Sequence, residues 1–275
     1  MQQNQQPIGI FDSGYGGLTV LKEIVKELPK HELLYLGDNA RSPYGTRSFE
    51  TIYQYTLQAV RYLFSQGCHL VVLACNTASA KALRNIQQLD LPLLAPHKRV
   101  LGVIRPTTEV IGHFTETKKI GILGTNGTVK SESYVMEINH LWPELTVFQQ
   151  ACPMWVPLVE NGELNGIGAE YFVQKNLNDL LLQSDKIDTV LLACTHYPML
   201  LPVIRSFIPP KIKIVEQGGI AAKSLKDYLQ RHPEMDELSG QNGKLLFQTT
   251  GDTSDFNEKA TLFFDKTIRS EHVKI

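Results

Sequence analysis

"VVLACNTASA" (residues 71–80) is an apolar run that ends in a thiol and continues directly into small polar residues. Short apolar runs of this kind are typical of buried strands. Asparagine, serine and threonine favour helix starts because their side chains can satisfy the unpaired backbone N–H groups found there. The stretch therefore predicts that Cys75 lies where a buried strand meets a helix.

The same pattern occurs again in "VLLACTHYP" (residues 190–198), where Leu-Ala-Cys is followed by Thr195 and His196. A Gly-Ile dipeptide at residues 9–10 also has a counterpart at 121–122, at a similar offset along the chain. Two similar offsets indicate an internal duplication. We therefore expect two similar domains related by pseudo-twofold symmetry, with the active site in the cleft between them.

Strand and helix patterns alternate along the rest of the chain. Helical spacing of apolar residues predicts helices at 18–28, 49–67 and 167–183. Strands are expected at 7–12, 32–38, 69–75, 145–152, 212–219 and 244–252, and a second series of strand and helix patterns begins with the stretch 119–131 and ends with 188–198. This alternation predicts an α/β fold with mainly parallel sheets. The proline-marked stretch 89–99 is interpreted as a joint between domains.

Composition limits the classes of partner. The chain has 275 residues, of which 43% are hydrophobic and 20% charged, and its formal net charge is −1. These values are typical of a globular protein with one large core or two smaller ones. They give no electrostatic reason to expect nucleic acid or a membrane as a partner, so a small ligand is favoured. Residues 1–7 lack the features of an export signal, and we expect a cytoplasmic protein.

The four cysteines are Cys68, Cys75, Cys152 and Cys194, and no two of them form a C-x-x-C pair. In a reducing cytoplasm they would remain thiols, which argues against disulfides and the common zinc patterns. We interpret Cys68 and Cys152 as small buried hydrophobic residues, because free cysteine is among the most buried residue types.

Polar residues gather where the predicted strands end. They are Asp12, Ser13, Asp38, Asn39, Cys75, Asn76, Thr77, Thr125, Thr128, Cys194, Thr195 and His196. Open parallel sheets bind ligands beyond these strand ends, and the helices that follow present N–H groups that suit carboxylates. Each hydroxyl or amide taken alone is better interpreted as a helix cap. Their number, in two matching sets, favours a binding site.

Two thiols on opposite sides of one cleft suit a reaction that removes a proton from one face of a carbon and returns it to the other. That reaction is racemisation or epimerisation. A free thiol is only a few per cent ionised at neutral pH, so the site must lower one thiol pKa and keep the other thiol protonated. Asp12 and His196 are the expected tuners of Cys75 and Cys194, respectively.

In six motifs that run nearly from end to end, the sequence resembles the glutamate racemases of the cofactor-independent aspartate/glutamate racemase group. The motifs are "GIFDSGYGGLTV", "GDNARSPYG", "ACNTAS", "GILGTNGTVKS", "CPMWVPLVE" and "ACTHYP". The resemblance implies interconversion of L- and D-glutamate, and hence a supply of D-glutamate for peptidoglycan. It also implies that the enzyme has neither a cofactor nor a metal.

The resemblance further implies roles for individual residues. Cys75 would act on D-glutamate and Cys194 on L-glutamate, with Asp12, Glu160 and His196 as catalytic support. Glutamate would be held by Ser13, Tyr44, Gly45, Asn76, Thr77, Thr125, Thr128 and Thr195. The resemblance implies a homodimer and a discontinuous first domain, which gives domains at residues 1–97 with 213–275 and at 98–212.

Two alternatives remain open. An aspartate racemase of the same superfamily would differ only in the depth of its cleft. A protein of a different class would bind a metal or another ligand between two domains, with Cys75, Cys194 and His196 as metal ligands. A pyridoxal enzyme is disfavoured because no lysine lies at the strand ends.

A few positions differ from the usual family pattern: Tyr15, Arg105, Trp155 and the pair Glu216–Gln217. None of them removes a reactive group. We expect them to affect domain packing, a side pocket near Trp155 and the dimer geometry.

Overall fold

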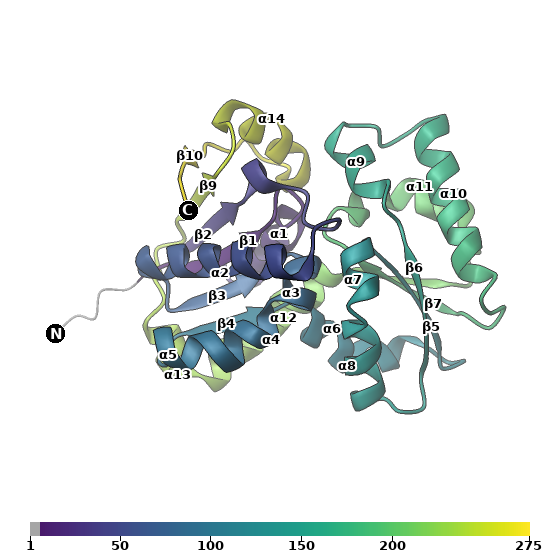
Figure 1. The fold of residues 1–275 in the computed structure, drawn as a ribbon, viewed down its shortest axis with the longest axis horizontal. Coiled ribbons are helices and arrows are strands. Elements are labelled where there is room, and N and C mark those ends of the chain that lie inside the picture. Colours follow the sequence, from purple (N-terminus) through teal and green to yellow (C-terminus); the bar gives the residue numbers. More distant parts are fainter. Residues whose placement is uncertain (1–5) are drawn as a thin grey trace.

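The computed structural model describes residues 6–275 and contains two α/β lobes side by side (Figure 1). The predicted α/β class with parallel sheets is confirmed. The pseudo-twofold relation between the halves stays a prediction. The expectation about an export signal falls largely on residues 1–5, which lie outside the described residues.

The first lobe is built on a parallel sheet with the strand order β10-β9-β2-β1-β3-β4. Its register pairs Asp12 with Gly37 and Phe11 with Leu73, so β1, β2 and β3 end at the same edge. The strands are β1 (Ile8–Asp12), β2 (Leu33–Gly37), β3 (Leu70–Leu73), β4 (Arg99–Gly102), β9 (Leu245–Thr249) and β10 (Glu271–His272).

The second lobe is built on a parallel sheet with the order β6-β5-β7-β8. Gly124 pairs with both Ala151 and Ala193, so the residues that follow these three strands also leave the sheet at one edge. The strands are β5 (Lys119–Gly124), β6 (Thr146–Ala151), β7 (Thr189–Ala193) and β8 (Lys213–Val215).

Helices of the first lobe cover both faces of its sheet, with α2 on one face and α1 packed against α12 and α14 on the other (Figure 1). Ser48 starts α2 by accepting a hydrogen bond from the Thr51 N–H (3.2 Å), and Gly67, with φ of 94°, follows its end. The helices are α1 (Leu18–Glu27), η1 (Asn39–Arg41), α2 (Phe49–Ser65), α3 (Asn76–Lys81), α4 (Leu83–Asn85), η2 (Ile86–Asp90), α5 (Leu91–Leu94), α12 (Gln217–Arg231), α13 (Pro233–Glu237) and α14 (Thr253–Phe264).

Helices of the second lobe pack in two groups, α6 with α8 and α10 with α11. Figure 1 shows α9, α10 and α11 on one side of this lobe and α7 and α8 on the other. The helices are α6 (Ile104–Val110), η3 (Ile111–Phe114), α7 (Asn126–Lys130), α8 (Ser133–Leu141), α9 (Trp155–Glu160), α10 (Ile167–Leu181), η4 (Tyr197–Leu200) and α11 (Leu201–Phe207).

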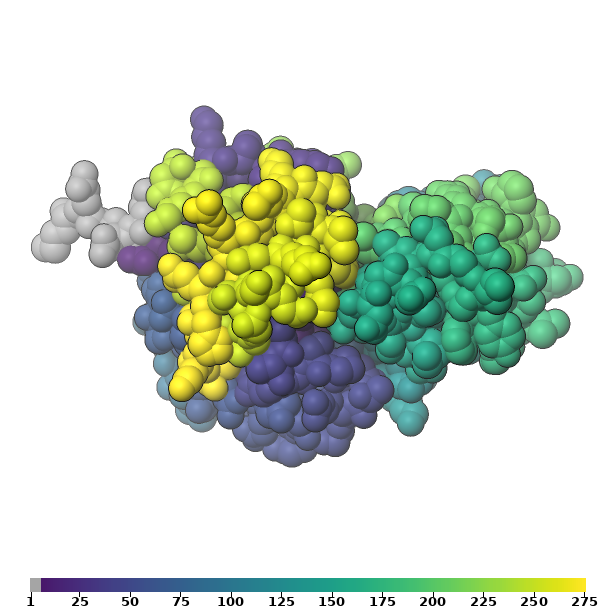
Figure 2. Space-filling view, turned by 90° about the horizontal axis from the view of Figure 1, so that it is seen from above, coloured from purple at the N-terminus to yellow at the C-terminus, as the bar shows by residue number. Residues whose placement is uncertain are grey.

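The chain passes between the sheets twice, through α6 after β4 and through α12 after β8. Strand β4 follows the predicted boundary at 97/98 but still belongs to the first sheet. Strand β8 follows the predicted boundary at 212/213 but still belongs to the second sheet. Figure 2 shows the C-terminal segment, in yellow, on the same lobe as the N-terminal segment, in purple. The domain ranges themselves stay a prediction.

Two local predictions need correction. The expected joint at 89–99 is mostly helical, because Pro92 lies in the first turn of α5, where its missing N–H leaves no hydrogen bond unmade. The expected strand at 212–219 is shorter, since β8 ends at Val215 and α12 begins at Gln217.

Successive residues of β1 pack into different hydrophobic clusters, as the alternation of side chains along a strand requires. Ile10 belongs to a cluster that includes residues of α1, whereas Phe11 belongs to one that includes residues of α2. The first of these clusters extends into the second lobe, where it includes Trp155. Among residues 6–275, none of the helices is both long and apolar enough to cross a membrane.

Trp155 is completely buried, and its ring lies edge-on to Tyr197 with the ring centroids 4.7 Å apart. We expect Trp155→Ala to lower the free energy of unfolding by about 3–5 kcal/mol, because it leaves a cavity in the core. Urea denaturation measures the effect. The control is Leu182→Ala in the same lobe, where Leu182 is 84% exposed and the expected loss is under about 0.5 kcal/mol. Similar losses in the two variants would contradict this account of the core.

Candidate active site

A cleft of about 620 Å³, including its open mouth, contains both repeated cysteines. Its lining combines residues that follow β1 and β3 of the first sheet with residues that follow β5 and β7 of the second, so it lies beyond the carboxyl ends of strands from both sheets. The lining residues are Ser13, Ser42, Pro43, Tyr44, Gly45, Thr46, Cys75, Asn76, Thr77, Thr125, Asn126, Cys152, Pro153, Val156, Pro157, Cys194, Thr195 and His196.

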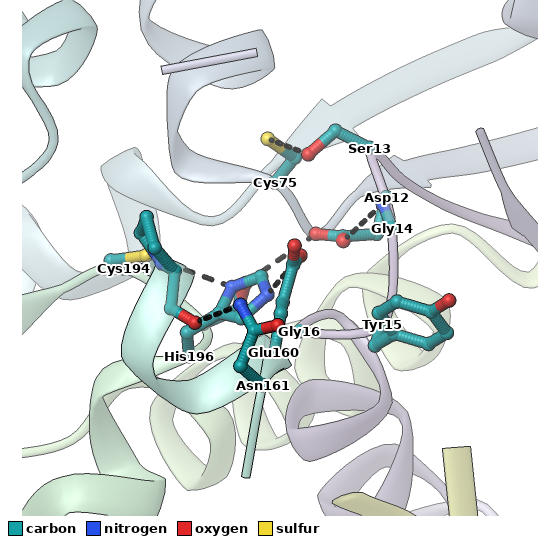
Figure 3. Close-up of polar contacts among 12 residues, drawn as sticks. Asp12, Ser13, Gly14, Tyr15, Gly16, Cys75, Glu160, Asn161, Cys194 and His196 are labelled. Carbon is teal, nitrogen blue, oxygen red and sulfur yellow. Dashed lines mark hydrogen bonds and ion pairs between the residues drawn. The ribbon is translucent and has the colours of Figure 1, made fainter. Parts of the chain in front are cut away.

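Cys75 is the N-cap of α3, and its sulfur accepts a hydrogen bond from the Ala78 N–H at 3.4 Å. The Ser13 hydroxyl lies 3.4 Å from the same sulfur (Figure 3). Burial, and next the negative charge of Asp12, raise the pKa of Cys75 to about 12. Cys75 is therefore a protonated thiol at neutral pH.

Cys194 lies at the end of a different chain of contacts (Figure 3). Its sulfur is 3.9 Å from His196 Nδ1, and His196 Nε2 is 3.0 Å from Glu160 Oε1. Burial disfavours a charged imidazole, but the hydrogen bonds to Cys194 and Glu160 outweigh it and raise the pKa of His196 to about 10. Glu160 therefore holds a positive imidazolium beside the Cys194 sulfur.

Asp12 is fully buried at the end of β1 and accepts a hydrogen bond from the Gly14 N–H at 2.9 Å. Thr195, from the second lobe, donates to its other oxygen at 3.5 Å. Burial raises the pKa of Asp12. In the turn after Asp12, position 16 leaves no room for a side chain, since a Cβ on Gly16 would lie 2.3 Å from the Thr195 hydroxyl oxygen. Glycine is therefore required where the two lobes meet.

Three threonine hydroxyls meet across the cleft. Thr77 lies 3.0 Å from Thr125 and 3.5 Å from Thr128, hydroxyl to hydroxyl. Thr125 also caps α7 by accepting from the Thr128 N–H at 3.2 Å. Gly45 packs against Thr125, and its carbonyl accepts from the Gly127 N–H at 2.9 Å. These contacts tie the two lobes together beside the thiols.

Asn76 offers the cleft an unused donor. Its Oδ1 accepts a hydrogen bond from the Tyr134 hydroxyl at 2.6 Å. Its Nδ2 is buried and has no hydrogen-bond partner among residues 6–275. A buried amide without a partner is costly, so this group is suited to binding a ligand oxygen.

Most residues predicted from the sequence line the cleft, but three lie behind its wall: Asp12, Glu160 and Thr128. Tyr44 is buried, and its hydroxyl donates to Asp38. Sequence reasoning missed several lining residues, namely Ser42, Pro43, Thr46, Asn126, Cys152, Pro153, Val156 and Pro157. Cys152 follows β6 as Cys194 follows β7, so the strand-end rule could have identified it.

Among the described residues 6–275, no lysine or arginine lines the cleft, and His196 is the one lining side chain that can carry a positive charge. The polar lining consists of hydroxyl, amide and thiol groups. Within residues 6–275, no three histidine, cysteine, aspartate or glutamate side chains form a group that could hold a metal ion. The alternative in which Cys75, Cys194 and His196 bind a metal gains no support from this geometry.

A sequence profile of the Asp/Glu/Hydantoin racemase family matches residues 8–225, which include both cysteines and all the polar strand ends described above. The chain belongs to this family.

Proteins of this Asp/Glu/Hydantoin racemase family resemble the chain over its full length. A glutamate racemase of Listeria innocua is 39% identical, and the alignment covers 98% of this chain and 99% of that protein. The structure of glutamate racemase isoform RacE1 from Bacillus anthracis has a TM-score of 0.88 and 34% identity, with 98% of each chain covered. The glutamate racemase of Francisella tularensis, in complex with D-glutamate, has a TM-score of 0.86 and 29% identity, with the same coverage.

The structure of an aspartate racemase is less similar to this chain. The enzyme from Picrophilus torridus has a TM-score of 0.52 and 18% identity, and the match covers 85% of this chain and 99% of that one. A likeness at this level indicates a shared fold and says nothing about substrate. The comparisons therefore do not favour the aspartate alternative.

The raised pKa of His196 predicts how stability depends on pH. The ordinary pKa of histidine is about 6.5, and in the folded protein it is about 10. The resulting stabilisation is complete below the unfolded pKa and is lost as pH rises through the folded pKa. We expect the difference in unfolding free energy between wild type and His196→Asn to shrink from pH 6.5 to pH 9.5, as measured by urea denaturation. A difference that stays constant would mean that His196 is not charged in the folded protein.

Proposed function

We propose that the chain is a glutamate racemase that interconverts L- and D-glutamate without a cofactor. The carrying observation is that two buried thiols, each at the end of a strand from a different sheet, line one cleft. Full-length similarity to glutamate racemases supports the choice of substrate. Turnover assays with glutamate and with aspartate test that choice directly.

In the proposed reaction, the Cys194 thiolate removes the proton from Cα of L-glutamate. The electron pair of the C–H bond stays on the substrate as a carbanion conjugated with its α-carboxylate. The Cys75 thiol then donates its proton to the opposite face of Cα. D-glutamate leaves, and the enzyme retains a Cys194 thiol and a Cys75 thiolate. The reverse reaction uses the same groups in exchanged roles.

The environments of the two thiols support this assignment. The imidazolium of His196 stabilises negative charge on Cys194, which suits a base. Burial and Asp12 keep Cys75 protonated, which suits an acid. We propose that Asp12 tunes Cys75, that Glu160 acts through His196, and that a substrate ammonium brought between the lobes supplies the charge that ionises Cys75 in the D-to-L direction.

We propose that neutral donors bind the two carboxylates of glutamate. These residues are Ser13, Tyr44, Gly45, Asn76, Thr77, Thr125, Thr128 and Thr195, with Thr128 acting from behind the residues that line the cleft. Lysine or arginine would stabilise the ground state and the carbanion alike. Catalysis needs preferential stabilisation of the developing charge, which small aligned dipoles can provide.

We also propose that the enzyme is a cytoplasmic homodimer that supplies D-glutamate for peptidoglycan. This proposal rests on the family resemblance. Analytical ultracentrifugation of the purified chain tests the oligomeric state.

Replacement of either thiol by a hydroxyl is expected to abolish racemisation. Cys75→Ser and Cys194→Ser should each lower kcat by at least about 10²–10⁴-fold, because an alcohol is far too weak an acid to supply the base. Turnover is measured by circular dichroism, which follows the conversion of L-glutamate to D-glutamate. Thermal unfolding checks that each variant is folded.

The matched control is Cys68→Ser, which makes the same change at a buried cysteine that does not line the cleft. It should keep most of the kcat, whatever its effect on stability. Near-native turnover in either cleft variant would exclude the two-thiol mechanism.

Two bases on opposite faces also predict where a solvent proton enters. When L-glutamate is incubated in deuterated water and sampled at low conversion, the new D-glutamate should carry deuterium at Cα, because the Cys75 thiol has exchanged with solvent. The recovered L-glutamate should keep its protium. Mass spectrometry of the separated enantiomers measures both.

The control is the same experiment started from D-glutamate. The new L-glutamate should then carry deuterium at Cα, and the recovered D-glutamate should keep its protium. A single base that served both faces would return the abstracted proton to the product. Substantial protium in the early product, in either direction, would therefore contradict the mechanism.

A further inference from the structure

A buried chain of hydrogen bonds runs from the crossover between the lobes to the cleft. Gln217, the first residue of α12, donates from Nε2 to the Tyr134 hydroxyl at 2.5 Å. Tyr134, in α8, donates to Asn76 Oδ1 at 2.6 Å. The exposed fractions of Asn76, Tyr134 and Gln217 are 2%, 0% and 4%.

The orientation of the Gln217 side-chain amide is fixed by two hydrogen-bond acceptors at the crossover helix α6. Gln217 Nε2 lies 3.4 Å from the Val103 carbonyl oxygen, which can only accept a hydrogen bond. It also lies 3.0 Å from the Thr107 hydroxyl, whose own proton is donated to the same carbonyl. Both partners require the nitrogen of the Gln217 amide, and not its oxygen, at this position.

The direction of the remaining bonds follows from the first. Because Gln217 Nε2 only donates, the Tyr134 oxygen accepts from it and must direct its single proton elsewhere. Burial raises the pKa of the Tyr134 phenol well above its usual range, so that proton is retained. It is donated to Asn76, which accepts with Oδ1 and therefore turns Nδ2 away.

Nδ2 of Asn76 is the buried amide nitrogen without a partner among the described residues, and Asn76 lines the cleft. A side-chain amide can turn over and exchange its oxygen and nitrogen with little change in shape. In one orientation a bound carboxylate meets a donor, and in the other it meets a carbonyl that repels it.

We infer that Tyr134 and Gln217 are positioning residues that hold the Asn76 amide with its N–H₂ toward a carboxylate of the bound amino acid. The identity of that ligand rests on the proposed function. Gln217 is one of the positions that differ from the usual family pattern, and in this chain its amide supplies the donor that sets the direction of the whole network.

The first test is Tyr134→Phe, which keeps the ring and removes only the hydroxyl. We expect KM for glutamate to rise about 5–10-fold with kcat changed less than about 2-fold, because substrate and transition state share the lost contact. The matched control is Tyr62→Phe, which removes a hydroxyl that donates to another side-chain amide, Gln248, outside the cleft. Its KM should equal that of wild type.

A double-mutant cycle separates positioning from mere stability. Asn76→Ala should raise KM further, and Tyr134→Phe added to it should change KM less than about 2-fold, because no amide remains to be oriented. If Tyr134→Phe does not fold, Gln217→Met replaces it in the same cycle, with an expected rise of about 3-fold. An unchanged KM in the single variant, or an equal effect with and without Asn76, would overturn the inference.

A second readout does not depend on turnover. The side-chain N–H₂ signals of Asn76, assigned in ¹⁵N spectra by their loss in Asn76→Ala, should shift in Tyr134→Phe and stay unchanged in Tyr62→Phe. If wild type racemises no glutamate, the proposed function fails, and these signals still decide whether Tyr134 orients Asn76. Signals that are identical in wild type and Tyr134→Phe would refute the positioning role.

Discussion

The alignment of parallel strands at their carboxyl ends is the constraint on which the rest of this structure depends. In the first sheet it brings Asp12, Asp38 and Cys75 to one edge, and in the second it does the same for Thr125, Cys152 and Cys194. Each of these positions lies at or just after the end of a strand whose backbone hydrogen bonds fix its place. Strand pairing within each sheet therefore brings together reactive groups that are far apart in the sequence.

Close contact between the lobes turns these two edges into one site. Gly16 lets the turn after Asp12 approach Thr195 and His196, where a side chain would collide with both. Hydroxyl contacts between Thr77 and Thr125 join the lobes near the thiols. Cys75 and His196 are buried in this cleft, where burial, hydrogen bonds and single charges shift thiol and imidazole pKa values strongly.

The residues that differ from the usual family pattern are accommodated in different ways. Tyr15 stacks between Phe256 and Phe263 of α14, and its hydroxyl donates to Asp255 at 2.5 Å. Trp155 is completely buried in the hydrophobic core. Arg105 forms an exposed ion pair with Glu109, a type of contact that contributes little to stability. Gln217 alone reaches the site, through Tyr134.

The sequence by itself determined the α/β class, the junctions at Cys75 and Cys194 and the polar strand ends that line the cleft, because strand periodicity and helix-capping residues are local signals. It did not reveal that Cys152 joins them, although the same strand-end rule applied, because a lone cysteine is more often a core residue. Strand β4 and the helical course of 86–94 were also missed, since tertiary packing there overrides the proline signal. Only the tertiary structure placed Glu160 behind His196 and Gln217 behind Asn76. Contacts of that kind join residues from separate elements, and their partners and directions depend on packing that no short stretch of sequence encodes.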